Sequence, residues 1–440
     1  MGIPFYFASL LKSHAGIIQG LKKDELLEVD VLGVDFNCLI HRYIQENNPI
    51  TSVLDAFQYI LDTVCKPKQL FISLDGLVPY AKIVNQRYRR MRAKEFTETF
   101  DRNQISPDTP FMRELEQGLR SRFPLAHIST TQDPGEGEHK LFSEIRKLPE
   151  DQRKNVVIYG LDADLILISL QNHKVSYPNE LYLLRETAEF NDPKLKSAEF
   201  ATLSIWKLLT QLPIEIDQYI ALSILCFGND FMPSLALFSL REGGYDRALQ
   251  FYEQCGKPNL LTAEGRSTFL QFAASKELPT LRERVMLRKR PEEKAIFGRQ
   301  NEMVSKKFGL HYLDGVSDMK PVVEAYWKTF HWTLHYFVNG EPLNWDWVYP
   351  YAECPLITDI VQFEETPKDK AGKCKYTLRE QLTFILPEGS LKPTKRKLKF
   401  PDEIYSETRN PWMKKYEWET KPRISLPWNP KYDLTSVEVL

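Results

Sequence analysis

Short apolar runs that alternate with amphipathic stretches dominate the first half of the chain. The runs at about 30–40, 69–75 and 155–161 are apolar enough to be strands buried on both faces. Between the first two, SVLDAFQYILDTV has apolar residues at the i, i+3, i+4 spacing of a helix. Helices between buried strands are typical of βαβ units. The pattern therefore predicts an α/β fold whose central sheet is mostly parallel and flanked by helices.

The rest of the chain adds mainly helices to this plan. Short strands are expected in LAHIST and ELYLLRE, and a helix is expected at 80–101. Further helices are expected from residue 5 and in FMRELEQGLRSRF, SIWKLLTQL, IDQYIALSILCF and the aromatic VVEAYWKTFHWTLHYFVNG. We divide the chain into a core at 1–245, a helical, charged connecting segment at 246–320, and a helical, aromatic-rich region at 321–440 that packs on the core.

Acids stand where the predicted strands end. Asp35 and Asp75 close two of the apolar runs, and Asp162 and Asp164 follow the third. In an open α/β sheet, the ligand site lies beyond the carboxyl ends of the parallel strands. The four acids are therefore expected at one edge of the sheet, unless the last pair is only a solvated acidic turn.

Three more acids have no packing reason for their positions. Glu136 and Glu138 lie in the run PGEGEHK, and Asp230 ends an otherwise apolar segment. A solvated turn is the alternative for the two glutamates, and a helix cap or turn explains Asp230 equally well in isolation.

Taken together, seven acids from separate parts of the sequence could meet at this edge: Asp35, Asp75, Glu136, Glu138, Asp162, Asp164 and Asp230. Buried like charges either become neutral or bind a cation. Oxygen ligands without a cluster of histidines and cysteines favour Mg²⁺ or Mn²⁺ over zinc. Two such ions about 3.5–4 Å apart are the arrangement that hydrolyses phosphodiesters. No Walker loop, Ser-His-Asp set or Cys-His set competes with this interpretation.

The helix expected at 80–101 is basic, with six lysines and arginines and no acid before Glu95. Four of its polar residues are spaced i, i+4, i+7 and i+8 and share one face: Lys82, Gln86, Arg89 and Arg90. A charge run on a helix is as often a solvated face when taken alone. Beside a carboxylate cluster, however, cations favour an anionic substrate, and arginine forks suit phosphate oxygens.

Composition limits the partners and the compartment. The formal net charge is −1, so nucleic acid would have to bind through a local basic patch. The six cysteines lie far apart with no C-x-x-C, which favours neither a zinc knuckle nor a disulfide framework. The N-terminus has no signal-peptide pattern, and no apolar run approaches the roughly 20 residues that span a bilayer. We expect a soluble, intracellular protein without a membrane partner.

Seven ordered motifs give the chain a family resemblance: MGIPFYF, VDFNCLIHR, LDGLVPYAKIVNQRYRRMR, PGEGEHK, YGLDADLILISL, GNDFMP and WDWVYPYAECPLITDI. They are spread over most of residues 1–390, and PGEGEHK is identical to the family signature. In these motifs the chain resembles the catalytic core of the Xrn family of 5′→3′ exoribonucleases. The resemblance implies a PIN/FEN-like nuclease core at 1–245 and a second conserved region in 321–440.

The resemblance also implies roles for individual residues. The seven acids would be the catalytic residues and the ligands of Mg²⁺ or Mn²⁺, with two ions bound. Lys82, Gln86, Arg89 and Arg90 would form a 5′-phosphate pocket too small for a cap or triphosphate. His41 would stack on the first bases together with Trp347, or with Trp345 as the other candidate, and Pro79 would exclude duplex at the entrance.

The implied activity is processive, metal-dependent 5′→3′ degradation of 5′-monophosphorylated single-stranded RNA to mononucleotides. The resemblance further implies a monomer in the cytoplasm that acts in RNA decay, with a decapping enzyme supplying the substrate. Two alternatives are a flap-endonuclease-like nuclease acting on branched DNA and a non-catalytic scaffold that binds RNA 5′ ends. All seven acids are present, which weighs against the scaffold.

The chain departs from the family pattern at a few places. Ala352, Glu353, Cys354 and Pro355 replace the family's H-Y-A-P, and Tyr88 stands where the family usually has serine. The chain is also short, which suits a viral or otherwise divergent member of the family.

Overall fold

The fold was obtained as a computed structural model. It describes residues 2–386 except residues 4, 24, 46, 94–99, 161, 177–179, 190–194, 196, 288–317 and 352–353, and except the side chains of 88–93, 189 and 284–287. Structural statements below concern this part of the chain.

Seven strands pair into one sheet in the order β1-β7-β6-β5-β2-β3-β4. They are β1 (Ile18–Gly20), β2 (Leu27–Asp35), β3 (Cys65–Ser73), β4 (His127–Ser129), β5 (Val156–Tyr159), β6 (Leu181–Glu186) and β7 (Phe200–Ser204). The pairs from β6 through β5, β2 and β3 to β4 are all parallel, while β7 is antiparallel to both of its neighbours. The α/β fold with a mostly parallel sheet is confirmed. The sequence did not predict β1 or β7.

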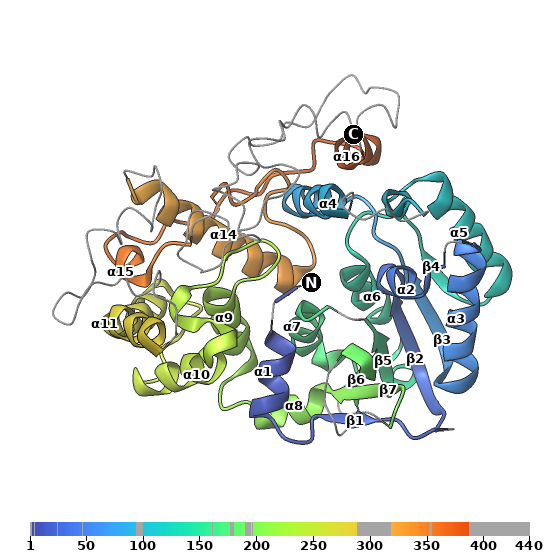
Figure 1. The fold of residues 1–440 in the computed structure, drawn as a ribbon, viewed down its shortest axis with the longest axis horizontal. Coiled ribbons are helices and arrows are strands. Elements are labelled where there is room, and N and C mark those ends of the chain that lie inside the picture. The colour runs from blue at the N-terminus through green and yellow to red at the C-terminus, as the bar shows by residue number, and fades with distance from the viewer. Residues whose placement is uncertain are drawn as a thin grey trace.

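The helices follow the predicted plan (Figure 1). They are α1 (Tyr6–Ser13), α2 (Phe36–Tyr43), α3 (Pro49–Thr63), α4 (Tyr80–Ala93), α5 (Pro110–Arg122), α6 (Gly137–Ile145), α7 (Asp164–Gln171), α8 (Ile205–Gln211), α9 (Ile216–Phe227), α10 (Gly244–Gln254), α11 (Ala263–Leu287), α14 (Lys320–Asn339), α15 (Ile357–Ile360) and α16 (Leu378–Ile385). Short 3₁₀ turns add η1 (Arg102–Gln104), η2 (Glu150–Gln152), η3 (His173–Val175), η4 (Thr187–Glu189), η6 (Ala236–Phe238) and η7 (Leu240–Glu242).

Local sequence signals set several helix ends. Thr109 caps α5 by accepting a hydrogen bond from the Met112 N–H, and α14 ends at Gly340, whose φ is 75°. The prediction that the basic helix reaches residue 101 is wrong at its end. Phe100 and Asp101 are not helical, because the Asp101 side chain caps the next turn, η1.

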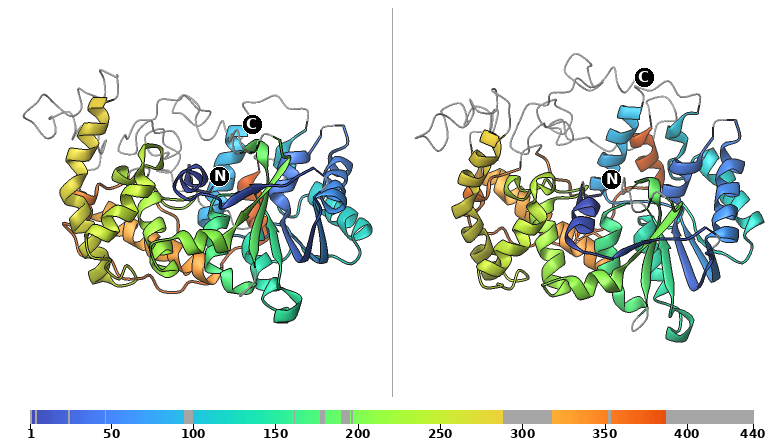
Figure 2. Two further views of the ribbon diagram at one scale, coloured as in Figure 1. Left: turned by 90° about the horizontal axis from the view of Figure 1, so that it is seen from below. Right: turned by 60° about the horizontal axis from the view of Figure 1, so that its bottom comes forward.

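Side chains alternate between the two faces of the sheet, and each face has its own apolar core. Val31 of β2 lies in the core formed with α1, α6, α7, α9 and α14. Its neighbour Leu32 lies in the core formed with α2, α3 and α5. Figure 2 shows the sheet on one side of the molecule and the helices α9, α10, α11 and α14 gathered on the other. The domain division at 245 and 320 stays a prediction, although α14 shares a core with α7 and α9.

Among the residues that the structure describes, no helix has the length and apolar character needed to cross a membrane.

Candidate active site

The parallel strand order places the predicted acids at one edge of the sheet. Asp35 is the last residue of β2, and Asp75 follows β3 by two residues. Asp162 and Asp164 follow β5, and Asp164 opens α7. Since β5, β2 and β3 are adjacent and parallel, these ends converge.

The other three acids reach this edge from helix ends. Glu136 directly precedes α6 and Glu138 lies in its first turn, while Asp230 lies three residues beyond the end of α9. Electrostatic interactions connect the whole set: Glu138 interacts with Asp164, Glu136 and Asp35, and Asp164 interacts with Asp230. We call the seven acids the acidic cluster. The sequence predicted their convergence, which the structure shows; their role as metal ligands stays a prediction.

Burial and mutual repulsion disfavour the ionised form of several acids in the acidic cluster. Burial, and after it the charge of Asp75, raises the pKa of Asp35 to about 7. Burial and the charges of Asp230 and Asp162 raise the pKa of Asp164 to about 7. Burial also raises the pKa of Asp75 and of Glu138. Such a set favours protonation or cation binding near neutral pH.

Glycine at position 137 lets α6 approach two of the acids. The Gly137 N–H donates a hydrogen bond of 2.8 Å to Asp75 Oδ1. A Cβ at this position would lie 3.1 Å from Asp35 Oδ1 and 3.6 Å from Asp75 Oδ1. The central glycine of PGEGEHK therefore permits a close approach that a larger residue would crowd.

The space around Gly2 is even more restricted than that around Gly137, and the sequence analysis did not identify this position. Its φ is +43°, and a Cβ would lie 1.7 Å from Asp164 Oδ1 and 2.9 Å from the Asp164 backbone nitrogen. The N-terminal segment is thus part of the wall of the acidic cluster. In Figure 1 the start of the chain lies between α6, α7 and α14. The glycine of MGIPFYF was only a partial signal, because glycine serves turns and flexible ends as well as close approaches.

Lys82 lies inside the acidic cluster. Its ammonium group forms an ion pair with Glu136 and lies 3.7 Å from Asp230 Oδ2. It also lies 6.0 Å from the centre of the Phe231 ring. The sequence placed Lys82 on a phosphate-binding face with Gln86, and the structure adds that its charge already offsets two of the acids.

The other members of that face are only partly described. Gln86 is half-buried, and its Oε1 has no hydrogen-bond partner among the described residues. Arg89 and Arg90 belong to α4, but their side chains lie outside the description. The phosphate pocket therefore stays a prediction.

Hydrogen bonds to the acids come from residues that the sequence analysis missed. The Tyr336 hydroxyl of α14 donates to Glu136 Oε1 at 2.5 Å. The Cys38 thiol donates to Asp35 Oδ2 at 2.8 Å, and the Asp75 N–H donates to Asn37 Oδ1 at 3.2 Å. Asn37 and Cys38 lie two and three residues after Asp35, so their spacing was a signal, whereas Tyr336 offered none.

Residues far along the chain also hold the loop that follows Asp75. Gln381 of α16 accepts a hydrogen bond of 3.0 Å from the Val78 N–H and donates one of 3.2 Å to the Gly76 carbonyl. The Tyr376 hydroxyl donates to the Val78 carbonyl at 3.0 Å. The segment that carries Asp75 into α4 is thus fixed by the region beyond residue 340.

The predicted base-stacking residues occupy different settings. His41 is exposed on α2, which argues against a buried structural role. The Trp347 indole donates to Thr329 Oγ1 at 3.1 Å, and the Lys328 ammonium lies 4.0 Å from its ring centre. Trp347 is thus engaged with α14.

Trp345, the other tryptophan candidate, lies beside the predicted entrance. It lines a cavity of about 180 Å³ together with Pro79, and its carbonyl accepts a hydrogen bond of 2.9 Å from the Tyr80 N–H. The structure therefore brings Trp345 next to Pro79. The stacking and duplex-excluding roles themselves stay predictions.

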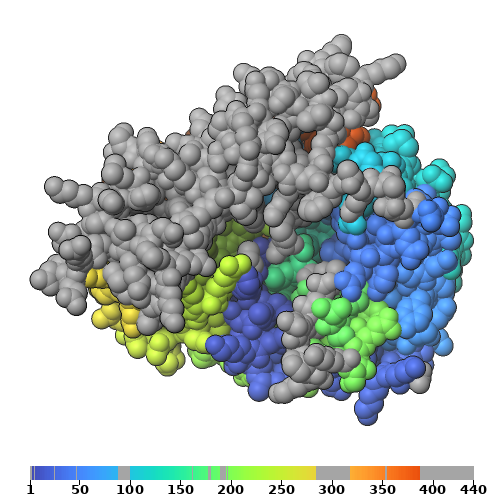
Figure 3. Space-filling model, viewed as in Figure 1, coloured from blue at the N-terminus to red at the C-terminus, as the bar shows by residue number. Residues whose placement is uncertain are grey.

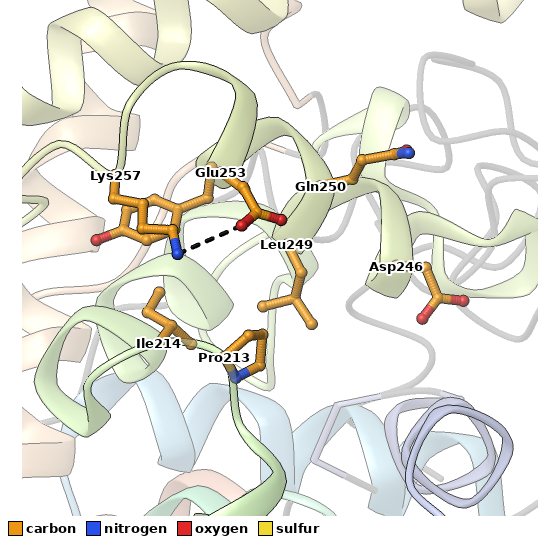
Figure 4. A pocket seen from close by; sticks show the side chains of 8 residues that line it. Pro213, Ile214, Asp246, Leu249, Gln250, Glu253 and Lys257 are labelled. Atoms are coloured by element: carbon orange, nitrogen blue, oxygen red, sulfur yellow. Dashed lines mark ion pairs between the residues drawn. The ribbon is translucent and has the colours of Figure 1, made fainter.

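A second cavity, of about 290 Å³, lies away from the acidic cluster (Figure 4). It is lined by the α8–α9 connection and by α10, with Ile214 and Leu249 as apolar residues and an ion pair of 3.3 Å between Lys257 and Glu253. It contains none of the predicted site residues.

The acids fit a divalent cation in donor chemistry. Asp35 Oδ1 and Asp164 Oδ1 are buried and accept no hydrogen bond from any described residue. All seven candidate ligands are carboxylates, which Mg²⁺ and Mn²⁺ prefer. Among the described residues, no three His, Cys, Asp or Glu side chains close around one point, and the Lys82 ammonium lies between two of the acids.

We expect the stability of the metal-free protein to fall as the pH rises from about 4 to 7. Asp35 and Asp164 have a pKa of about 7 in the folded protein, against an ordinary value of 3.8 for an aspartate, so the folded state holds more protons in this range. In EDTA, the melting temperature should therefore be higher at pH 5 than at pH 8. Saturating Mg²⁺ should raise it by a few degrees at pH 8 and much less at pH 5, because cations bind the ionised acids.

Differential scanning calorimetry with and without Mg²⁺ measures this effect, with KCl at equal ionic strength as the control. A melting temperature that rises from pH 5 to pH 8 in EDTA, or an equal response to KCl, would contradict the cation-binding role.

The comparisons with known proteins agree with the geometry. The family model of the XRN 5′-3′ exonuclease N-terminus matches residues 1–99 and 94–187. The model of the Xrn1 helical domain matches residues 296–394. These matches contain six of the seven acids and the whole of α4.

Curated relatives support the same family. Human 5′-3′ exoribonuclease 1 is 25% identical over 537 residues, which cover 89% of this chain and 31% of the relative. The Saccharomyces cerevisiae 5′-3′ exoribonuclease 1 is 28% identical over 321 residues, which cover 58% of this chain and 21% of the relative. The chain thus spans about a third or less of the length of these relatives.

Solved structures of flap-type nucleases are similar at a lower level. The bacteriophage T5 D15 protein with metal ions gives a TM-score of 0.31 at 11% identity and covers 50% of this chain and 74% of that one. Flap endonuclease-1 from Methanococcus jannaschii gives 0.32 at 14% identity, with 54% and 74% covered. TM-scores this low decide nothing about the fold, which rests on the strand order itself. With the family models matched over residues 1–187 and 296–394, the chain belongs to the Xrn family of 5′→3′ exonucleases.

Proposed function

We propose that the chain is a metal-dependent 5′→3′ exoribonuclease that degrades 5′-monophosphorylated single-stranded RNA to mononucleotides. The observation that carries the proposal is the convergence of seven acids at the carboxyl ends of β2, β3 and β5, beside the basic helix α4. The relatives are named as 5′-3′ exoribonucleases, which supports the direction and the substrate class.

Asp35, Asp75, Asp162, Asp164, Asp230, Glu136 and Glu138 would hold the divalent cations. When bound, Mg²⁺ or Mn²⁺ would activate a water molecule and offset charge on the phosphate. Lys82 lies on α4 beside Glu136 and Asp230, and there it would contact the 5′-phosphate once cations offset the charge of these acids. The arginines of α4 would complete the contact with the terminal phosphate.

The remaining residues would guide the strand. His41 on α2 would stack on a leading base with a tryptophan, for which Trp345 is now the better candidate because it lies beside Pro79. Pro79 would exclude duplex at the same entrance. Processive action, a monomeric state, a place in cytoplasmic RNA decay and a decapping enzyme that supplies the substrate complete the proposal.

The test is the degradation of one 3′-labelled RNA that carries a 5′-monophosphate, a 5′-triphosphate or a 5′-hydroxyl, in Mg²⁺, Mn²⁺ or EDTA. We expect only the monophosphate RNA to disappear, without internal fragments and only with metal. Internal cuts, or cuts irrespective of the 5′ end, would favour a flap-type nuclease. Binding of the monophosphate end without cleavage would favour a scaffold.

We expect Arg89→Ala to lower the preference for a 5′-monophosphate over a 5′-hydroxyl by roughly tenfold or more, because a charge-assisted hydrogen bond to phosphate contributes about 1.5–3 kcal/mol. The ratio of kcat/KM for the two RNAs measures this. Arg120→Ala, an exposed arginine on α5, is the matched control. An unchanged ratio in Arg89→Ala would place the phosphate pocket elsewhere.

A further inference from the structure

An exposed phenylalanine stands near the acidic cluster in an unusual backbone conformation. Phe5 is 46% exposed and has a φ of 64°, in the left-handed region that bulky residues rarely adopt. Its carbonyl accepts hydrogen bonds of 3.0 Å from both the backbone N–H and the hydroxyl of Ser9, which fix this start of α1. Strained residues that the surroundings hold in place are concentrated at functional sites.

The neighbours of Phe5 in the chain place it beside the acids. Gly2 packs against Asp164 so closely that a Cβ at position 2 would overlap the Asp164 carboxylate. Three residues of extended chain span at most about 11 Å, so Phe5 lies within that distance of Gly2 along the backbone. Ile3 and Tyr6 on either side are buried, so the backbone that carries the exposed Phe5 ring is fixed by packing. Figure 3 shows the surface hollowed where the blue N-terminal residues meet blue-green ones.

Arg241 places a positive charge next to the Phe5 ring. Its guanidinium lies 4.2 Å from the centre of the Phe5 ring, and it is exposed on η7. It forms no ion pair with any residue that the structure describes. An exposed aromatic ring next to an arginine without a carboxylate partner is the combination that binds single-stranded nucleic acid, since the ring stacks on a base and the guanidinium binds a phosphate.

We propose that Phe5 and Arg241 form a binding subsite for single-stranded RNA, in which Phe5 stacks on a base downstream of the scissile phosphate and Arg241 contacts the adjoining phosphate. The subsite lies on the α1 side of the acidic cluster, whereas His41 lies on α2. It rests on the proposed function for the identity of its ligand, and it adds a contact made by a residue of the MGIPFYF motif. The alternative is a cation–π pair that only ties α1 to η7.

Fluorescence of 2-aminopurine tests the stacking directly. The probe is a 5′-monophosphate RNA with 2-aminopurine placed at successive positions from the 5′ end, bound to the full chain in EDTA so that no hydrolysis is needed. We expect one position to be quenched by the wild type and not by Phe5→Ala, and the Kd of Phe5→Ala to rise roughly tenfold. Phe5→Tyr keeps the ring and should keep both properties.

Phe5→Leu is the matched variant, because it keeps apolar volume and the same backbone strain but lacks the ring. It should resemble Phe5→Ala. Arg241→Ala should weaken binding and reduce the slope of log K against log salt by about 0.7, the loss of one phosphate contact on a single strand. Unchanged Kd and quenching in Phe5→Ala and Phe5→Leu would overturn the subsite, and a lower melting temperature alone would support the structural pair.

These readouts are separate from catalysis. If the wild type binds and quenches the probe but cleaves no RNA in Mg²⁺, the subsite stands and the exonuclease proposal fails. If the wild type cleaves RNA while Phe5→Ala and Phe5→Leu bind and quench as the wild type does, the exonuclease proposal stands and the subsite fails.

Discussion

We expect Asp164→Asn to slow RNA hydrolysis by roughly a thousandfold or more and to leave the affinity for RNA within about twofold of the wild type. Asp164 is buried and interacts with Asp230, Asp162 and Glu138, so it belongs to the centre of the acidic cluster. Asparagine keeps the shape and removes the charge that a cation needs. Bound cations supply several kcal/mol of transition-state stabilisation, which corresponds to the expected loss in kcat.

Stability separates this loss from misfolding. Because burial holds the pKa of Asp164 at about 7, its ionised form destabilises the metal-free fold at pH 8. Asp164→Asn should therefore melt no lower than the wild type in EDTA at pH 8, and it should gain less from Mg²⁺. A variant that loses activity through misfolding would melt at a lower temperature.

The matched control for Asp164→Asn is Asp217→Asn. Asp217 also lies in the first turn of a helix, α9, so both changes lose a similar interaction with the helix dipole. Asp217 is exposed and outside the acidic cluster, so full activity is expected. Wild-type turnover by Asp164→Asn would remove this acid from the proposed metal site.

The central strands β2, β3 and β5 could be predicted because the carboxyl end of each is buried and an acid ends it or closely follows it. The stretch of β2 from Val31 to Val34 and the whole of β5 carry no charge, since helices cover both faces of a parallel sheet. β1 and β7 could not be predicted in the same way. The β1 residues Ile18–Gly20 are too short to show a period, and β7 leads directly into α8 at Ser204.

The acids of the site could be found because charge at the end of an apolar strand has no packing reason. Their support could not be found, since it depends on contacts across long separations. Tyr336 reaches Glu136 across 200 residues, and Gln381 reaches Gly76 across 305. The spacing of residues along the sequence gives no sign of hydrogen bonds between residues so far apart. The ion pair between Lys82 and Glu136 is of the same kind, because it depends on how closely α4 approaches α6.

Gly2 illustrates a signal that was present but incomplete. Glycine in MGIPFYF could mark a turn, a flexible end or a close approach, and only the position of α7 decides among them. The structure places it against Asp164, which opens α7.

We expect Gly2→Ala to lower kcat by roughly a hundredfold, because a displacement of about 1 Å at a catalytic group can cost that much. The added Cβ would lie 1.7 Å from Asp164 Oδ1 and 2.9 Å from the Asp164 backbone nitrogen. Either the carboxylate rotates away, which alters the acidic cluster, or the N-terminal segment lifts, which removes part of its wall. Single-turnover hydrolysis of 5′-monophosphate RNA in Mg²⁺ measures the loss.

Gly16→Ala separates the contact from backbone strain. Gly16 also has a positive φ, of 71°, but nothing lies within 4 Å of the position of its Cβ. Both variants force alanine into the left-handed region, at a similar cost in stability. If the contact with Asp164 matters, only Gly2→Ala loses activity, and its response to Mg²⁺ in calorimetry changes as well. Equal activities of the two variants would mean that the N-terminal segment does not hold Asp164 in the working protein, since the strain is common to both and only the neighbouring carboxylate differs.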